Sequence, residues 1–263
     1  MIFNSYLYIF LFVPIILLLY YSLAKYKFGR IGIFVLTIAS LFFYAYWKPK
    51  YIFIIVVSIL TNYCCSFFIL KSQTKYFNKL IATGAILFNI SLLIYFKYIN
   101  FIFDIINAVL PLHINNLKIL LPLGISFFTF TQIAFIVDCY KGKVQDSNFM
   151  NYCLFVTFFP HLLAGPIIHH SEMMPQFSNY SNKKIKWFNM YSGMCLFSLG
   201  LFKKVVIADY FATIVDNFFS QANVLNISLW DSWTASLGYS IQLYYDFSGY
   251  TDMAIGVALL FNK

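Results

Sequence analysis

Two aspartates, Asp246 and Asp252, lie within residues 239–256, a stretch whose remaining composition is that of a membrane-spanning helix. Each carboxylate would cost about 2.5–3.5 kcal/mol at the centre of an isolated membrane helix on insertion scales. The pair therefore predicts a protein-lined or hydrated interior rather than a lipid-facing surface. In such an interior, carboxylates can line a substrate site or take part in an ion or proton pathway.

Helical geometry places the two aspartates on different faces of this segment. At about 100° per residue, Gln242 and Asp246 share one face, whereas Ser248 and Asp252 lie on a second stripe roughly 120° away. Gly249 lies between the two aspartates in the sequence, where it permits a bend or a close contact with another helix. The chain is therefore expected to bend or to pack closely at this glycine.

A second polar series runs through residues 121–142. Ser126, Thr129 and Gln132 follow one another at three-residue spacing, and Asp138 lies near the end of the segment. Two interpretations fit this pattern. In one, the polar side chains form hydrogen bonds between helices and Asp138 pairs with Lys141. In the other, they line a cavity.

Three of the four histidines lie in FFPHLLAGPIIHH, residues 158–170, among two prolines and a glycine. Histidine is the usual general base near neutral pH, so His161, His169 and His170 are candidates for proton transfer. The alternatives are a hydrogen-bonded core position for His161 and an interfacial position for the other two. No metal site is predicted, because no HExxH motif or Cys/His pairing completes a ligand set.

Two adjacent cations, Lys203 and Lys204, occur in GLFKKVVIAD, residues 200–209. In one interpretation their ammonium groups reach a lipid head-group region, and in the other they anchor an acidic cofactor or a phosphate. Nucleophile-elbow, P-loop and GxGxxG motifs are absent from the sequence. No motif of this kind therefore assigns a reaction.

The composition is that of an integral membrane protein. Of the 263 residues, 61% are hydrophobic and 10% are charged, against about 45–50% and about 25% in soluble domains. The net charge of +9 comes from cations that separate apolar runs. This distribution favours anchoring by the positive-inside effect and excludes a basic nucleic-acid-binding domain.

Four apolar runs, each near the ~20 residues that cross a bilayer, are predicted to be transmembrane helices. They cover residues 6–23, 31–47, 51–70 and 80–99. The first run lacks a basic leader and a cleavage site, so we interpret it as a retained span. The cations favour the first and third connections on the cytoplasmic side, which places the N-terminus outside.

Beyond residue 99 the apolar pattern is interrupted. Residues 101–110 are amphipathic and predict an interfacial helix. The segments 123–140 and 151–168 contain polar residues, prolines and glycines, which predict broken or re-entrant helices covered by protein. Residues 229–261 exceed one span, so an interfacial turn is expected before the helix with the two aspartates. The predicted fold is an all-α, multi-pass transmembrane helical bundle, with residues 1–263 in a single membrane domain.

Four blocks of sequence together resemble the membrane-bound O-acyltransferase family, in its bacterial alginate O-acetyltransferase branch. They are LPLGISFFTF at 121–130, FFPHLLAGP at 158–166, GLFKKVVIAD at 200–209 and QLYYDFSGYTDMAIG at 242–256. Each block is short, but the order and spacing of all four are similar to those of the family. The N-terminal helices fit as well, so the resemblance covers essentially the whole chain.

The resemblance implies full-length and re-entrant helices around a tunnel, in which an acyl group passes from a cytosolic donor to a hydroxyl beyond the membrane. Acetyl-CoA is the implied donor, with no covalently bound cofactor. The implied acceptor is an extracytoplasmic polysaccharide such as alginate or another cell-surface glycan, reached through periplasmic or surface acetyl-transfer partner proteins. The implied location is the lipid bilayer of the bacterial cytoplasmic (inner) membrane, with no nucleic-acid partner.

The family's catalytic histidine is implied to lie beyond Lys263, in a motif of the type Arg-Trp-His-Ile-Ser-Leu that this chain does not contain. None of the chain's histidines, His113, His161, His169 and His170, occupies that position. The chain is therefore expected to be a truncated form that corresponds to the N-terminal half of a longer enzyme. By itself it is expected to lack acyltransferase activity. The candidates for the tunnel wall are Gln132, Asp138, His161, Gln242, Tyr245, Asp246, Ser248 and Asp252.

Two other classes stay open. A channel or transporter also uses broken helices and intramembrane carboxylates. It would show matching broken helices in two halves, however, and the sequence contains no internal repeat. A non-catalytic membrane scaffold fits a chain without the family's base.

Overall fold

The computed structural model describes residues 2–25, 29–110, 114–144, 148–162, 169–179, 182, 184–221 and 228–263. Two compact units make up the chain. The first contains Met1–Gly32, Ala164–Pro166 and Asn179–Lys263, and the second contains Ile33–Leu163 and Ile167–Ser178. His113 and most of the glycine-proline part of the second sequence block lie outside the described residues. The single membrane domain stays a prediction.

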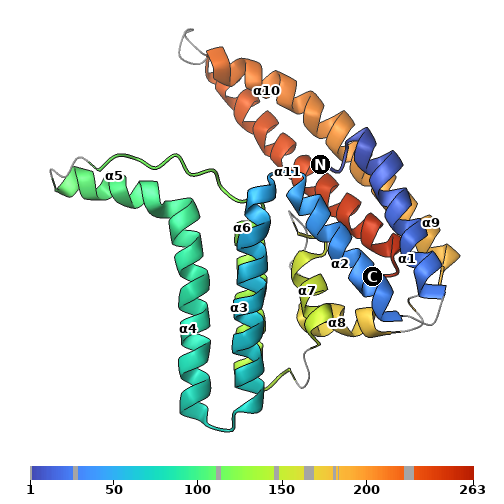
Figure 1. Cartoon of the computed structure of the whole chain (residues 1–263). Helices are drawn as coiled ribbons and strands as arrows, with labels where there is room; N and C mark the ends of the chain where they lie inside the picture. The colour runs from blue at the N-terminus through green and yellow to red at the C-terminus, as the bar shows by residue number, and fades with distance from the viewer. Residues whose placement is uncertain are drawn as a thin grey trace. The chain divides into compact units, whose positions relative to one another are not determined.

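Every regular element of the described residues is helical, which confirms the predicted all-α fold (Figure 1). The elements of the first unit are η1 (Tyr8–Phe12), α1 (Val13–Lys25), α9 (Trp187–Phe202), η5 (Lys203–Ala208), α10 (Asp209–Gln221) and α11 (Leu229–Leu260). Those of the second unit are most of α2 (Gly29–Ala45), then η2 (Pro49–Tyr51), α3 (Ile52–Lys71), α4 (Lys75–Leu93), η3 (Ile94–Tyr98), α5 (Ile99–Val109), α6 (Ile125–Tyr140), α7 (Phe149–Thr157) and α8 (His170–Ser178).

Helices form at all four apolar runs near the N-terminus. By length and composition, two helical stretches of the described residues could cross a membrane, Pro49–Lys71 and Lys75–Val109. Shorter apolar helices cover Tyr8–Leu23, Ile31–Ala45 and Ile125–Tyr140. Large apolar side chains on these elements face outward, including Phe53 at 73% exposure, which suits contact with lipid tails.

The amphipathic residues 101–110 fall within α5. The π-helical turn η3 separates α5 from α4, and α5 turns away from the end of α4 at a steep angle (Figure 1). None of the residues of α5 is buried. The residues form the expected helix, and its interfacial position stays a prediction.

In the first unit, α11 packs against α9, η5 and α10, which form an almost continuous helical rod running in the opposite direction (Figure 1). Glycines bring the two backbones together. A Cβ atom added at Gly200 would lie 2.6 Å from the Gly249 carbonyl oxygen, and one added at Gly193 would lie 2.7 Å from that of Gly256. Gly249 therefore provides a close helix contact, the second of the two roles expected from the sequence.

Helix α11 is unbroken over 32 residues and is about 48 Å long at 1.5 Å per residue. Ser228 caps its first turn. The Ser228 hydroxyl accepts from the Asp231 backbone N–H, and the Asp231 carboxylate accepts from that of Ser228. The expected interfacial turn within residues 229–261 was therefore wrong, because this capping box starts one helix at Leu229 that exceeds the length of a span.

In the second unit, α6 packs against α3 and α4, and α7 packs against α3, α6 and α8. Asn62 of α3 and Asn89 of α4 are fully buried and exchange amide hydrogen bonds of 3.2 and 2.6 Å. An aromatic core lies beside them, in which Phe135 of α6 is fully buried. Its ring contacts the imidazole of His170 at a centroid distance of 5.3 Å, so this core places the end of α6 beside the start of α8.

Candidate functional site

One group of charged residues, called the Lys–Asp network below, lies in the first unit. It consists of Lys203 and Lys204 of η5, Asp209 of α10, and Asp246 and Asp252 of α11. The two lysines project from the helical rod toward α11. The sequence offered lipid head groups or an acidic cofactor as their partners, whereas the structure pairs them with the chain's own aspartates.

Each ammonium group of this network contacts more than one oxygen. Lys203 Nζ lies 2.6 Å from Asp252 Oδ2 and donates to Ser248 Oγ at 3.1 Å. Lys204 Nζ lies 2.9 Å from Asp209 Oδ1 and 2.8 Å from Asp246 Oδ1. The Asp252 side chain is 21% exposed and that of Asp246 is 48% exposed. The two candidate aspartates thus differ in how far other groups can reach them.

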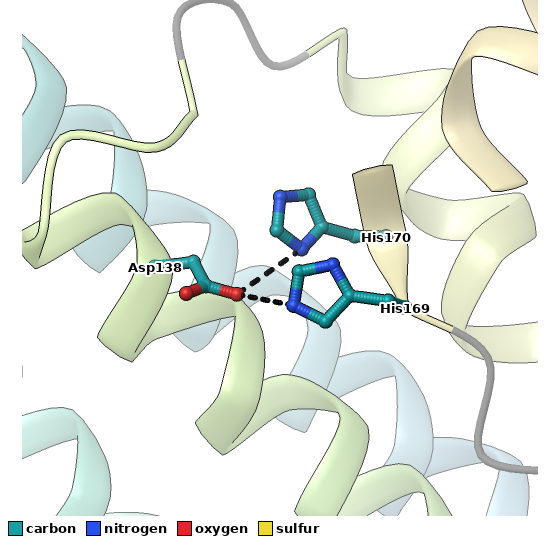
Figure 2. A group of neighbouring side chains, drawn as sticks. All are labelled: Asp138, His169 and His170. Atoms are coloured by element: carbon teal, nitrogen blue, oxygen red, sulfur yellow. Dashed lines mark ion pairs between the residues drawn. The ribbon is translucent and has the colours of Figure 1, made fainter. Parts of the chain in front are cut away.

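A second group, called the Asp138 cluster below, lies in the second unit and consists of Asp138, Lys143, His169 and His170. Asp138 belongs to the last turn of α6, and the two histidines lie at the start of α8 (Figure 2). Asp138 Oδ2 lies 2.7 Å from His169 Nε2 and 3.5 Å from His170 Nδ1. Lys143 Nζ is farther away, 3.8 Å from Asp138 Oδ1.

Burial distinguishes the members of the Asp138 cluster. The side chains of Asp138 and His170 are 8% and 7% exposed, whereas that of His169 is 45% exposed. Burial lowers the pKa of His170, His169 and Lys143 add to the effect, and the Asp138 carboxylate opposes it. The neutral imidazole of His170 is thus favoured, a form that can accept a proton or bind a metal ion.

A cavity of about 490 Å³ adjoins the Asp138 cluster. Its lining includes His170 and Lys143 of the cluster, together with the polar side chains of Asn148, Asn151 and Ser171. An ammonium group, an imidazole, amides and a hydroxyl can all contact a small polar ligand. The cluster therefore combines a buried carboxylate with access to a polar space.

The other candidates lie outside both groups. Gln132 is fully buried, and its Oε1 accepts from the Ser58 hydroxyl at 3.3 Å and from the Tyr152 hydroxyl at 3.4 Å. This arrangement corresponds to the interhelical hydrogen bonding that was one of the two interpretations. His161 has its ring 5.6 Å from that of Phe158, and its Nδ1 is buried without a partner among the described residues.

Gln242 and Tyr245 lie on α11 beside the Lys–Asp network. Gln242 Oε1 is buried and has no hydrogen-bond partner within the described part of the chain. Tyr245 is partly exposed. The structure thus brings together Asp246, Ser248 and Asp252 around the two lysines, and Gln242 and Tyr245 lie beside them on the same helix.

Comparison with known proteins decides the family. Residues 18–262 match the model of the membrane-bound O-acyltransferase family. The chain belongs to the membrane-bound O-acyltransferase family. A peptidoglycan O-acetyltransferase of Helicobacter pylori is 42% identical, over 100% of this chain and 54% of that protein. A probable alginate O-acetylase of Pseudomonas syringae pv. tomato is 36% identical, over 99% of this chain and 49% of that protein.

The chain spans about half the length of the curated O-acetyltransferase relatives that it matches. A more distant match, a teichoic acid D-alanyltransferase of Lacticaseibacillus rhamnosus, is 26% identical over 57% of this chain and 38% of that protein. The names of these relatives describe different acyl groups and acceptors. The comparisons therefore establish the family of the chain and leave its donor and acceptor to be tested.

Two of the blocks that carry the resemblance to the O-acyltransferases meet in the structure. The block at 200–209 supplies both lysines of the Lys–Asp network, and the block at 242–256 supplies Asp246 and Asp252. In the sequence analysis each of these residues is a separate candidate, and no pairing between them is predicted. The available signal was the double lysine in one apolar segment and the two aspartates in another, since buried charges require partners.

Lys143 was not among the predicted site residues. Lys141 had been weighed as the partner of Asp138, but Lys143 is the lysine that approaches it. The chain turns back after α6 because Gly142 adopts a positive φ of 70° and the Lys143 backbone N–H donates to the Asp138 carbonyl at 3.0 Å. A glycine just after an apolar helix is a signal for such a turn and could have identified this lysine.

Proposed function

We propose that this chain forms part of an enzyme that acetylates hydroxyl groups of a polysaccharide outside the cytoplasmic membrane. The observation that carries the proposal is the 42% identity, over 100% of the chain, to a protein named peptidoglycan O-acetyltransferase. Relatives named as probable alginate O-acetylases reach 36% identity. Because the identity is higher, peptidoglycan is the first acceptor to test, followed by alginate or another cell-surface glycan.

The proposed donor is acetyl-CoA, and the proposed reaction requires no covalently bound cofactor. In the proposed reaction, the hydroxyl oxygen of the acceptor attacks the thioester carbonyl, and a base takes up the hydroxyl proton. The carbon–sulfur bond breaks and coenzyme A leaves as its thiol or thiolate. The base is expected on a histidine of the family motif that is absent from these 263 residues, and the present helices would hold the reactants in place.

In this reaction, the proposed role of the Lys–Asp network is to position polar side chains of α11. Its ion pairs hold η5 against α11, so the polar side chains of α11 keep a fixed position. Asp252, which is mostly buried and bound to Lys203, suits this structural role. Asp246 is more exposed and shares a helical face with Gln242, so it is the better candidate for the tunnel wall.

The proposed location is the bacterial inner membrane, with several membrane-spanning helices. Long apolar helices with outward-facing apolar side chains support it. A donor made in the cytoplasm and a glycan outside it require acyl transfer across the bilayer. Periplasmic or surface acetyl-transfer proteins are the proposed partners that pass the acetyl group to the glycan.

The test compares the source bacterium, a strain from which the gene is deleted and the deletion strain with the intact gene restored. Acetate released by mild base is measured from purified peptidoglycan and, separately, from secreted polysaccharides. Ester-linked acetate of the peptidoglycan should fall to background on deletion and return with the gene. A loss confined to a secreted polysaccharide would move the acceptor to that glycan, and unchanged acetate in every fraction would contradict the proposal.

A further inference from the structure

Two imidazoles and one carboxylate converge at a single point of the second unit (Figure 2). Each of Asp138, His169 and His170 offers one ligand atom, and these three atoms all lie within 4.8 Å of one another. His169 and His170 approach the same carboxylate oxygen, Asp138 Oδ2. Three donors of nitrogen and oxygen type that meet in this way can share one cation.

Two distances within this group, both from Asp138 Oδ2, can be compared with those around a zinc ion. Zinc lies about 2.0–2.2 Å from imidazole nitrogen and carboxylate oxygen, so two ligands of a tetrahedral ion are roughly 3.3 Å apart. The observed separations from Asp138 Oδ2 are 2.7 Å to His169 Nε2 and 3.5 Å to His170 Nδ1. A small rotation of the exposed His169 ring would open the shorter separation.

Ser171 supplies a second contact that would orient His169. Its Oγ lies 2.7 Å from His169 Nδ1. With a metal ion on Nε2, the Nδ1–H group would donate to this hydroxyl, an arrangement common for metal-bound histidines. Without a metal ion, the proton can reside on Nε2 and bind Asp138. Nδ1 then accepts a hydrogen bond from the Ser171 backbone N–H at 3.4 Å.

We propose that Asp138, His169 and His170 form a binding site for a divalent transition-metal ion, with zinc the best fit to the donor set. Two histidines and a carboxylate are a frequent zinc ligand set, and the fourth position is then taken by water or a bound ligand. His170 lines the adjoining cavity, which gives that position access to solvent. The ion would tie the start of α8 to the end of α6.

This proposal departs from the prediction of no metal site. That prediction rested on the absence of ligand motifs with local spacing. Here one ligand comes from α6 and two come from the start of α8, and the fold brings them together. The inference does not depend on the acyl acceptor or donor, so it can fail while the proposed acetyl transfer holds.

The test measures zinc binding by the 263-residue chain, purified in detergent with an affinity tag that contains no histidine. The protein is stripped with EDTA, exchanged into metal-free buffer and titrated with Zn²⁺, and bound zinc is measured by mass spectrometry after gel filtration. One zinc ion per chain is expected, together with a higher Tm. Co²⁺ should then give visible absorption that Zn²⁺ abolishes.

Variants test whether the bound ion lies at this site. His169→Gln and Asp138→Asn should each weaken zinc binding at least ~100-fold, since even residues behind the ligands typically change affinity by 10–100-fold. The 45% exposure of the His169 side chain makes its variant the safer one for folding, and its gel-filtration profile should match that of the unaltered chain. Glu172→Gln is the matched control, because Glu172 is an exposed carboxylate on the same helix.

Two outcomes would overturn the proposal. One is a chain that retains no zinc at stoichiometric level and whose Tm does not respond to Zn²⁺. The other is wild-type affinity in both His169→Gln and Asp138→Asn, which would place the ion elsewhere. In either case the group would be a hydrogen-bonded Asp–His pair.

Discussion

The Lys–Asp network and the Asp138 cluster both hold carboxylates in largely apolar protein, but they balance the negative charge differently. The network sets its carboxylates against two lysines, whose ammonium groups stay protonated at physiological pH. Asp138 instead faces two imidazoles, and the lysine nearest to it is 62% exposed and 3.8 Å away. Permanent ion pairs suit a fixed helix position, whereas imidazoles allow proton or metal exchange.

The backbone is also more constrained around the Lys–Asp network than around the Asp138 cluster. The network lies beside glycines at which α9 and α11 touch along their lengths. The Asp138 cluster lies where α6 ends and α8 begins. Helix ends can adjust by small rotations, while a backbone contact between two helices cannot. We therefore expect substitutions at the glycines and at Asp252 to act on folding, and those at Asp138 and His169 to act on binding.

The largest effect is expected from Gly200→Ala. The added Cβ would lie 2.6 Å from the Gly249 carbonyl oxygen and 2.7 Å from the Met253 backbone nitrogen. No side-chain rotation can relieve contacts with backbone, so α9 and α11 must separate, at a cost of about 3 kcal/mol or more. Thermal unfolding in detergent measures the loss.

Gly84→Ala is the matched control for that variant. A Cβ at Gly84 meets nothing within 4 Å, and alanine is favoured over glycine inside a helix by about 1 kcal/mol. This control should be neutral or slightly stabilising. Equal destabilisation by both substitutions would show that the close α9–α11 contact does not limit stability.

Asp252→Ala should cause the next largest loss. It removes the 2.6 Å partner of Lys203, whose side chain is only 33% exposed, and leaves that ammonium group with Ser248. The expected cost is about 1–3 kcal/mol of unfolding free energy. Lys203→Met combined with Asp252→Leu should recover part of it, because an apolar pair has no charge to desolvate. A double variant less stable than Asp252→Ala would argue against this explanation.

Asp246→Ala should have a smaller effect on folding. Lys204 keeps Asp209 as a partner, and the Asp246 side chain is 48% exposed. The stability loss is expected to stay below ~1 kcal/mol. In the complete enzyme, the same change should lower acetyl transfer while expression stays near normal, if Asp246 lines the tunnel. Unchanged acetate on the glycan together with normal yield would remove Asp246 from the site.

Lys143→Gln should change stability least, within ~0.5 kcal/mol, because exposed ion pairs contribute little. The two imidazoles would still face Asp138. Comparison of its Tm with that of Asp252→Ala tests the contrast between the two regions. A Tm loss as large as that of Asp252→Ala would show that Lys143 is the main partner of Asp138.

The sequence predicted the helices better than their contacts. Long apolar runs form helices because hydrophobicity and span length are local properties, and α3 and α4 follow directly from them. The pairs Lys203–Asp252 and Asp138–His169 join distant segments, so their existence depends on how helices pack. Individual residues were identified as candidates, but the partner of each was fixed by the fold.

The spacing of the glycines in the sequence also carries packing information. Gly193 and Gly200 are separated by two helical turns, as are Gly249 and Gly256, so each pair occupies one face of its helix. Small residues on one face of a helix are typical of close helix contacts in membranes. The continuous α11 was missed for another reason, since the length of a bilayer span does not limit a helix that has its own N-terminal cap.

The glycine contacts also restrict where an acyl chain can travel. Between α9 and α11, the space that even a methyl group would need is already filled by carbonyl oxygens and backbone nitrogens at Gly193, Gly200, Gly249 and Gly256. A methylene chain is wider than this gap, so neither a lipid tail nor an acyl group can slip between the two helices at those levels. At those levels the helix pair forms a closed wall, so an acyl group would have to pass along one of its outer faces.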